Sequence, residues 1–484
     1  MSMLKMALVL VNAILLASLL LTPGCANARL WLATFDRVIS DGAGGAIALY
    51  DVMKNASRRE FYAQRIAPDG QRLWGDRGTL VGNADKGTAA ATNIRLVSDG
   101  DSGAIIAQRN TGYAPGKQTT TVTRVSSEGK VLWQRDSAPI DRIVSGGDGG
   151  AVIAWVEGTT ISVNRFDSNG QLPWGQTGVS FGRPRYGTIS LEVTGDGAGG
   201  AILAWLESDP QRAKPSNSGT NDEIYAQRID PEGKLAWGVD GVRVYVSPAD
   251  AAGSWLRISD DASGKSLLTW EQHPTVGVQD DSPTGFLSDI CVQALDTTGA
   301  GAWQPNGSTL GISREAGVRS TPHAPLIVRD GSGGAVVVWQ DARDIPQAVY
   351  AQRVSANGTT QWAAGGIKMF DVHSGRANRI QVIGDENGGV IVSLTFYDLL
   401  SRQHGVRVRK LDAEGNSPWV VEPANISVDL TVGTHYTVSD GEGGALFAWS
   451  TRNTDLSDSE ASFMQRIGPG GELMWGKDGV RLDE

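Results

Sequence analysis

Short apolar runs bounded by glycine and aspartate recur along the chain, and no long segment after the first thirty residues has the periodicity of an amphipathic helix. The segment SDGEGGALFAW at 439–449 is typical of the pattern, because an Asp-Gly-x-Gly-Gly cluster separates a preceding apolar run from the run ALFAW. Glycines in such a cluster supply the positive φ angles of a tight hairpin turn. The pattern therefore predicts β-hairpins and an all-β protein.

Each hairpin signal is followed by a second signal that ends in tryptophan. In RIDPEGKLAWG at 228–238, Gly233 lies four positions before Trp237 and Arg228 lies nine positions before it. The same spacing recurs at eight tryptophans, usually with a basic residue at the first position. They are Trp74, Trp133, Trp174, Trp237, Trp303, Trp362, Trp419 and Trp475. Each of these segments reads as a third strand, a short turn and a fourth strand.

The turn between the first two strands carries an aspartate in every copy but one. These residues are Asp41, Asp99, Asp196, Asp261, Asp330, Asp385 and Asp440, and Gly146 takes the position in the third copy. The aspartates could cap the turn or bind calcium. One carboxylate per turn is far fewer oxygen ligands than a calcium loop provides, which favours capping.

Eight copies of a four-stranded unit of roughly 55 residues predict a single eight-bladed β-propeller with antiparallel blades. We expect it to occupy residues 29–484. The expected blade starts lie near residues 32, 93, 140, 188, 255, 324, 379 and 434. A tryptophan at one fixed place in each blade would fill the wedge between neighbouring sheets. The first copy begins at its own first strand, so we expect little strand exchange between the two ends of the ring.

The segment QALDTTGAGAW at 293–303 resembles the tryptophan-docking motif of quinoprotein-type propellers, with a spacing one residue shorter. That superfamily includes quinone-dependent dehydrogenases and a lipoprotein of the outer-membrane assembly machinery. The resemblance implies a ring, but the dehydrogenases carry an adjacent cysteine pair that this sequence lacks. A quinone-dependent dehydrogenase is therefore the least favoured function, and we expect no cofactor. The S-D-G-x-G-G turns are also similar to the structural Asp-box turns of sialidase-like propellers, and no catalytic residue is carried over.

The first 28 residues have the order of a secretory signal peptide, with Lys5, an apolar run from Ala7 to Leu21 and a segment of small residues. Cleavage after Ala28 competes with a lipobox-like ending at Cys25, which would be lipidated. We therefore expect an exported protein in the periplasm, at the outer membrane through a lipid anchor, or outside the cell.

The charge and the rare residue types limit the function further. The formal net charge of -10 opposes binding to nucleic acid or to an anionic membrane surface. The five histidines lie singly and far apart along the chain, and Cys291 lies in the apolar run ICVQAL, where a buried inert thiol is expected. We assign no catalytic or metal-binding residue.

An acidic residue follows the strand-end aromatic position in five copies. The expected binding residues are Asp51, Glu157, Glu207, Glu271 and Asp341, with Arg343 beside them. They would form an acidic, cation- or glycan-binding mouth on the face that carries the long loops. The alternative is that strands simply end in solvated charges.

The sequence favours a non-enzymatic, exported propeller that acts as a protein-interaction or scaffold module and is a monomer. The alternative is a glycan-binding or glycan-cleaving propeller that uses two carboxylates of the long-loop face.

Overall fold

Each repeat forms one four-stranded antiparallel sheet, here called a blade. The structure, a computed structural model, describes residues 38–55, 58–85, 94–111, 118–182, 188–209, 221–247, 251–261, 263–274, 288–310, 323–344, 347–372, 379–397, 404–419, 424–428, 431–452 and 460–483. The expected signal peptide and Cys25 lie outside these ranges.

The blades follow one another along the chain. The first four contain β1 (Val38–Ser40), β2 (Ala46–Asn55), β3 (Arg58–Ile66) and β4 (Thr79–Asp85); β5 (Ile94–Ser98), β6 (Ala104–Thr111), β7 (Gln118–Val125) and β8 (Val131–Ser137); β9 (Arg142–Ser145), β10 (Ala151–Glu157), β11 (Thr160–Phe166) and β12 (Val179–Phe181); β13 (Thr188–Gly195), β14 (Ala201–Asp209), β15 (Asn221–Ile229) and β16 (Val242–Val246). The last four contain β17 (Ala251–Asp260), β18 (Ser266–Pro274), β19 (Asp289–Leu295) and β20 (Ser308–Thr309); β21 (His323–Arg329), β22 (Ala335–Asp341), β23 (Ala348–Val354) and β24 (Ile367–Asp371); β25 (Ile380–Gly384), β26 (Val390–Tyr397), β27 (His404–Leu411) and β28 (Ala424–Val428); β29 (Thr431–Ser439), β30 (Ala445–Arg452), β31 (Glu460–Ile467) and β32 (Val480–Arg481).

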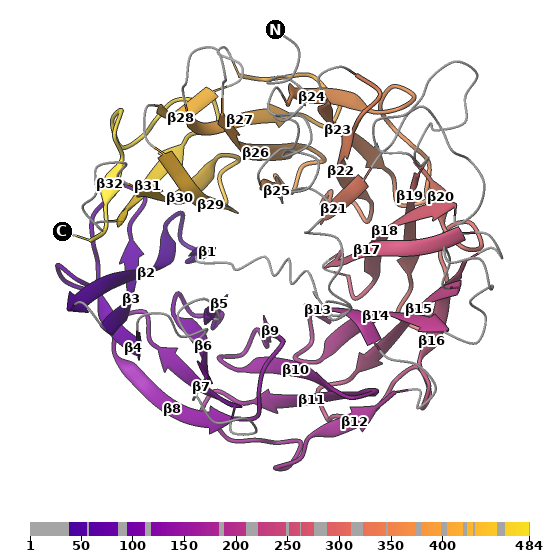
Figure 1. Ribbon diagram of the computed structural model, residues 1–484, viewed down its shortest axis with the longest axis horizontal. Helices are drawn as coiled ribbons and strands as arrows, with labels where there is room; N and C mark the ends of the chain where they lie inside the picture. The colour runs from indigo at the N-terminus through magenta and orange to yellow at the C-terminus, as the bar shows by residue number, and fades with distance from the viewer. Residues whose placement is uncertain are drawn as a thin grey trace, which may run out of the picture. The chain divides into compact units, whose positions relative to one another are not determined.

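The eight blades form a closed ring, with the first strand of each blade nearest the centre (Figure 1). Contacts between neighbouring first strands run in chain order around the ring, and β29 of the last blade meets β1 of the first. The predicted eight-bladed β-propeller with four antiparallel strands per blade is confirmed. Every sheet is built from four consecutive strands, so the ring closes without strand exchange.

In seven of the eight blades, an aspartate holds the first turn. In the last blade, Ser439 of β29 pairs with Ala445 of β30, and Asp440 Oδ1 accepts hydrogen bonds of 2.9 Å from the Glu442 amide and 2.8 Å from the Gly444 amide. Gly443 in this turn has a φ of 87°, which only glycine adopts without strain. The aspartate acts as a turn cap.

In six blades, the second carboxylate oxygen of the aspartate binds the basic residue at the end of the third strand. Asp440 Oδ2 lies 3.0 Å from Arg466 Nε, and both side chains are buried. The pairs that share this arrangement are Asp41–Arg65, Asp99–Arg124, Asp196–Arg228, Asp330–Arg353, Asp385–Lys410 and Asp440–Arg466. In the third blade, where Gly146 stands in place of the aspartate, Asp148 pairs with Arg165 instead. Both oxygens of the aspartate are thus used inside the blade.

The repeated tryptophans lock each blade to the next. Each indole Nε1 donates to a backbone carbonyl in the following blade's turn between the third and fourth strands. The bonds are Trp74 to Ser127, Trp133 to Ser168, Trp174 to Pro231, Trp237 to Thr297, Trp303 to Ala356, Trp362 to Ala413, Trp419 to Pro469 and Trp475 to Pro68, at 2.9–3.1 Å. The last bond joins the eighth blade to the first.

The repeated glycine makes room for the tryptophan of the preceding blade. A Cβ added to Gly233 would lie 2.8 Å from Cδ1 of Trp174, which is closer than real Cβ contacts allow. The glycine and the tryptophan of the repeat therefore belong to two successive junctions. This explains why both recur at a fixed spacing.

The core lies between the sheets, and the second strands are buried on both of their sides. In β14, Ile202, Leu203, Ala204 and Trp205 are all fully buried. A strand that packs against sheets on both faces loses the alternation of apolar and polar residues. This accounts for the continuous apolar runs such as AILAW.

Candidate functional site

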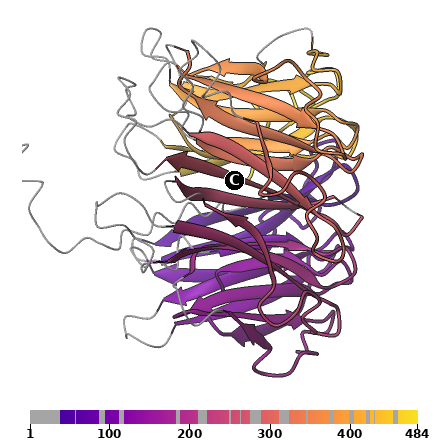
Figure 2. The same cartoon turned by 90° about the vertical axis from the view of Figure 1, so that its right-hand side faces the viewer.

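The ring has two different faces. In each blade the Asp turn joins the first two strands and the glycine-containing turn joins the last two, and these short turns share one face because neighbouring strands are antiparallel. The second strands end, and the third strands begin, at the opposite face. Figure 2 shows the strands running from one face to the other.

The five acidic residues expected on the loop face do not share one side of their strands. Asp51 and Glu271 lie ten residues after the first-turn position of their blades, whereas Glu157, Glu207 and Asp341 lie eleven residues after it. Side chains at successive positions of a strand point to opposite faces of the sheet. The two groups therefore face different neighbouring blades.

Glu207 and Asp341 are buried and bind the tryptophan two residues before them. The Trp205 indole donates to Glu207 Oε1 at 2.7 Å, and the Trp339 indole donates to Asp341 Oδ2 at 3.2 Å. Their exposed fractions are 3% and 0%. These two carboxylates satisfy buried indole groups and do not project from the face.

Arg343 is held by the same carboxylate. Its Nε lies 2.8 Å from Asp341 Oδ2, and its guanidinium carbon lies 4.0 Å from the ring centroid of Tyr350. The Arg343 Nη1 also donates to the Gly365 carbonyl at 3.0 Å. The arginine thus joins the second, third and fourth strands of its own blade.

Asp51 and Glu157 lie nearer the surface. Asp51 Oδ2 accepts a hydrogen bond of 2.9 Å from Arg59 Nη1 on the neighbouring strand. Glu157 is exposed at the end of β10, where it pairs with Thr160 across the hairpin. Neither geometry brings the two residues together, because they belong to the first and third blades.

Glu271 is the acidic residue with the most unusual surroundings. It is 9% exposed, and burial raises the pKa of its carboxyl group to about 7. Its Oε2 accepts a long hydrogen bond of 3.4 Å from the Ala324 amide of the next blade. Ala324 has a φ of 53°, in the left-handed region, beside a register shift in β21. The carboxyl group thus faces an irregular first strand across a blade junction.

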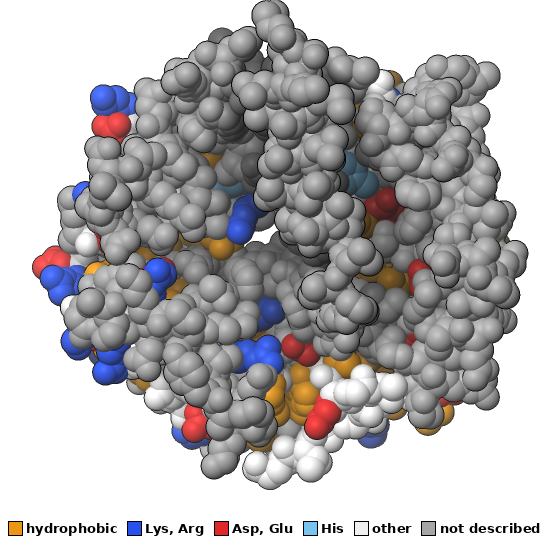
Figure 3. All heavy atoms as spheres, in the orientation of Figure 1, with side chains coloured by type: hydrophobic (Ala, Val, Ile, Leu, Met, Phe, Trp, Pro, Cys, Tyr) orange, Lys and Arg blue, Asp and Glu red, His pale blue; other side chains and the backbone are white. Residues whose placement is uncertain are grey.

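A group of charged residues on the first strands was not among the expected site residues. Arg142 of β9, Glu192 of β13 and Arg257 of β17 come from the first strands of three successive blades, and Glu192 pairs with both arginines. Figure 3 shows Lys and Arg side chains beside the hollow in the middle of one face. Aligning the repeats on the turn aspartate would have revealed them, because all three lie four residues before that position. We call Arg142, Glu192, Arg257 and the adjacent Trp255 the channel patch.

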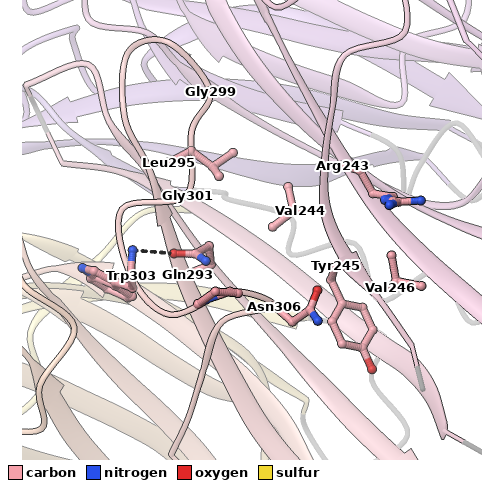
Figure 4. A pocket seen from close by; sticks show the side chains of 11 residues that line it. Arg243, Val244, Tyr245, Val246, Gln293, Leu295, Gly299, Gly301, Trp303 and Asn306 are labelled. Atoms are coloured by element: carbon pink, nitrogen blue, oxygen red, sulfur yellow. Dashed lines mark hydrogen bonds between the residues drawn. The ribbon is translucent and has the colours of Figure 1, made fainter.

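A groove of about 320 Å³ lies on the outer side of the fourth and fifth blades (Figure 4). It is bordered by Arg243 and Val244 of β16 and by the segment around Gly299 and Trp303 of the fifth blade. The Gln293 side chain in this groove accepts a 3.0 Å hydrogen bond from the Trp303 amide, so it holds the blade rather than a ligand. Of the described residues along the lining, Arg243 is the one whose side chain is charged at neutral pH.

Cys291 and His435 are buried in surroundings that disfavour their charged forms. Cys291 is buried, and burial raises the pKa of its thiol to about 12, which disfavours the thiolate. His435 is fully buried, and burial lowers the pKa of its imidazole to about 3. Within these ranges no three His, Cys, Asp or Glu side chains lie close enough to hold a metal ion. The same part of the chain contains no helix with the length and hydropathy of a membrane span.

No family model and no curated protein sequence matches the chain. Solved structures that resemble it include a polysaccharide lyase, Uly1, at 9% identity and a TM-score of 0.45, covering 83% of this chain and 93% of the lyase. A eukaryotic initiation factor matches at 9% identity and a TM-score of 0.43, over 93% of this chain and 88% of that one. The β-propeller domain of the Trilobed protease from Pyrococcus furiosus matches at 11% identity and a TM-score of 0.37, over 78% and 96%. These similarities are too distant to carry a function.

Proposed function

We propose that the protein is a non-enzymatic, exported propeller that binds a partner protein and serves as an interaction or scaffold module. The observation that carries this proposal is an arc of exposed apolar side chains formed by Leu73, Leu132 and Met474. They stand at the same position of the repeat, immediately before the docking tryptophan, in the first, second and eighth blades. Their exposed fractions are 45%, 51% and 46%.

The arc is confined to one side of the ring. In the other five blades the same position holds a small or polar residue, namely Pro173, Ala236, Ala302, Gln361 and Pro418. The fold therefore does not require a large apolar side chain there. The arc spans three neighbouring blades because the eighth blade lies beside the first. Val131 and Leu80, each 48% exposed, extend the apolar surface in the second and first blades.

Charges of both signs surround the arc. Asp76 and Arg77 are exposed beside Leu73, and Lys477 and Asp478 are exposed beside Met474. An apolar centre with a mixed polar rim is the anatomy of a protein–protein interface rather than of a nucleic-acid or membrane surface. The opposite face, where the second strands end and the third strands begin, offers a second surface.

A photo-crosslinking residue placed at Leu73 tests the proposal in the cells that make the protein. We expect one discrete protein adduct, which is weakened by Leu132→Ser and Met474→Ser and which re-forms with the purified partner. The matched control is the crosslinker at Ala302, the equivalent position on the opposite side of the ring. Equal adducts from both positions, or no adduct from Leu73, would contradict a binding role for the arc.

Glycan binding is the second candidate function. The loop-face carboxylates support it weakly, because Glu207 and Asp341 bind buried indole groups. The export of the protein and the lipidation of Cys25 belong to the same proposal, and labelling with a radioactive fatty acid, compared between the wild type and Cys25→Ser, tests the lipid anchor.

A further inference from the structure

The channel patch has a charge opposite to that of the protein as a whole. At the position four residues before the first turn, four successive blades carry Arg95, Arg142, Glu192 and Arg257, in a chain whose net charge is -10. They pair across their hairpins with Ala107, Ala154, Ala204 and Thr269, so they lie at one level of the ring. A concentration of arginines at one level of a channel in an acidic protein attracts anions.

One carboxylate holds two of the arginines. Glu192 Oε1 accepts hydrogen bonds of 3.1 Å from Arg142 Nη2 and 3.3 Å from Arg257 Nη1. The three side chains are 17–19% exposed, so they are largely packed but part of each remains accessible to solvent. One negative charge between two positive charges leaves the group with a net positive charge. Glu192 therefore fixes both guanidinium groups without neutralising them.

Arg257 keeps one edge of its guanidinium group free. Its Nη1 donates to the Leu256 carbonyl at 2.8 Å and to Glu192. Its Nε and Nη2 have no hydrogen-bond partner among the described residues, although an arginine has five donor hydrogens. The Nε–Nη2 edge is the fork that binds both oxygens of a carboxylate.

Trp255 lies beside this fork in an unusual backbone conformation. The Arg257 guanidinium carbon lies 6.0 Å from the centroid of the Trp255 ring system. Trp255 has a φ of 54°, at a register shift between Ser254 and Arg257 that inserts an extra residue opposite β18. A bulky residue in the left-handed region is strained, and such strain gathers at binding sites. The 6.0 Å distance shows that the indole lies next to the Arg257 guanidinium group.

We propose that the channel patch binds an acidic saccharide. The Arg257 fork takes the carboxylate of a uronic acid, and the face of Trp255 packs against the apolar C–H face of the sugar ring. Glu192 and Arg142 are positioning residues that hold Arg257. A carboxylate alone would need only the arginines, and a neutral sugar would need only the indole, so the pair selects a ligand that carries both features. The inference does not depend on the proposed protein interaction, which concerns a different surface.

Calorimetric titration of the full chain tests the proposal with three probes. They are an oligogalacturonate, a cello-oligosaccharide of the same length and poly-L-glutamate. We expect the oligogalacturonate to bind and both other probes to bind at least about tenfold more weakly. Arg257→Gln and Trp255→Ala should each weaken oligogalacturonate binding at least about tenfold, and Trp255→Phe should restore most of it.

The matched control is Arg243→Gln, which removes an arginine that is 56% exposed on the outer strand β16. It should leave binding of the oligogalacturonate unchanged. The unfolding temperature of each variant confirms that the ring is intact. The proposal is overturned if the oligogalacturonate does not bind, if Arg257→Gln and Trp255→Ala leave its affinity unchanged, or if the cello-oligosaccharide binds equally well. Equal binding of poly-L-glutamate that is insensitive to Trp255→Ala would assign the patch to acidic peptides instead.

Discussion

The indole nitrogen of Trp475 in the last blade donates a hydrogen bond of 3.0 Å to the carbonyl oxygen of Pro68 in the first blade. Arg466 Nη1 reaches the same carbonyl at 3.3 Å. This junction repeats the geometry of the internal junctions, for example that of Trp362 and Arg353 with Ala413. The ring is therefore closed by side chains docking between blades, without a shared sheet.

Trp475→Phe should loosen the closing junction more than an equivalent change elsewhere. The substitution removes one hydrogen bond worth about 1 kcal/mol and part of the packed surface of the indole. No short chain connection crosses the closing junction, whereas Trp237→Phe affects two blades that the chain itself joins. Hydrogen exchange should therefore accelerate in β1 and β29 of Trp475→Phe and stay unchanged there in Trp237→Phe. Equal exchange in both variants would show that other contacts hold the closing junction.

Gly233→Ala and Gly238→Ala should differ in stability although both glycines have a positive φ. The φ values are 83° and 79°, so each alanine pays about 1 kcal/mol for the left-handed conformation. Only at position 233 would the new Cβ strike the Trp174 ring, because nothing lies within 4 Å of the Cβ position at Gly238. Urea unfolding should show an additional loss of about 1–3 kcal/mol for Gly233→Ala. Equal losses would mean that the tryptophan moves aside without cost.

Glu271 should make the ring less stable as the pH rises. Its pKa is about 7 in the folded state and 4.5 as an unperturbed group, so the folded protein prefers the protonated carboxyl. A folded pKa above the unfolded one means that this contribution is complete below pH 4.5 and is lost as the pH rises through 7. Glu271→Gln should raise the free energy of unfolding at pH 8 by up to about 3 kcal/mol and change it little at pH 4.

The measurement is the unfolding temperature of Glu271→Gln and of wild type across this range of pH. Glu157→Gln is the matched control, because Glu157 is exposed at the end of the equivalent strand of the third blade. A stabilisation that is the same at pH 4 and pH 8 would show that titration of Glu271 is not its cause.

Asp440→Ala should destabilise the last blade strongly. It removes the buried carboxylate partner of Arg466, which leaves that arginine paired only with Glu442, whose side chain is 64% exposed, and it removes two caps from the first turn. Breaking a buried ion pair costs about 3–5 kcal/mol, whereas a change at an exposed charge such as Asp478→Ala costs less than about 0.5 kcal/mol. Chemical denaturation of the two variants measures the difference, and a loss below 1 kcal/mol for Asp440→Ala would refute a structural role for the pair.

The blade count was predictable from the sequence because each junction uses a local signal. The spacing of Gly233 and Trp237 is set by a single turn, and the same turn is needed eight times. The partner of each tryptophan was not predictable, since it lies a whole repeat away. The sequence also did not reveal the role of Gln227, whose side chain accepts from the Trp237 amide and donates to the Gly238 carbonyl.

The side of the strand on which each acidic residue lies was not predictable from the sequence. Glu207 and Glu271 differ by one position along their strands, counted from the first turn of each blade. Because of this difference they face different neighbouring blades. The channel patch needed a second kind of information, because Arg142 and Arg257 come within reach of Glu192 only when successive first strands are brought side by side. Bulges such as the one at Trp255 also change the direction in which side chains point along a strand. The pattern of apolar and polar residues does not predict them.

Each sequence repeat forms one complete sheet, so the chain can be cut and rejoined between repeats without dividing a sheet. Since each blade is contiguous in the sequence and all junctions use the same docking, no junction is the obligatory place for the chain to begin. Circular permutation, with Asp483 joined to Val38 by a linker and new ends placed between β16 and β17, should preserve the ring. The order of the blades in space is thus separable from the order in which they are synthesised.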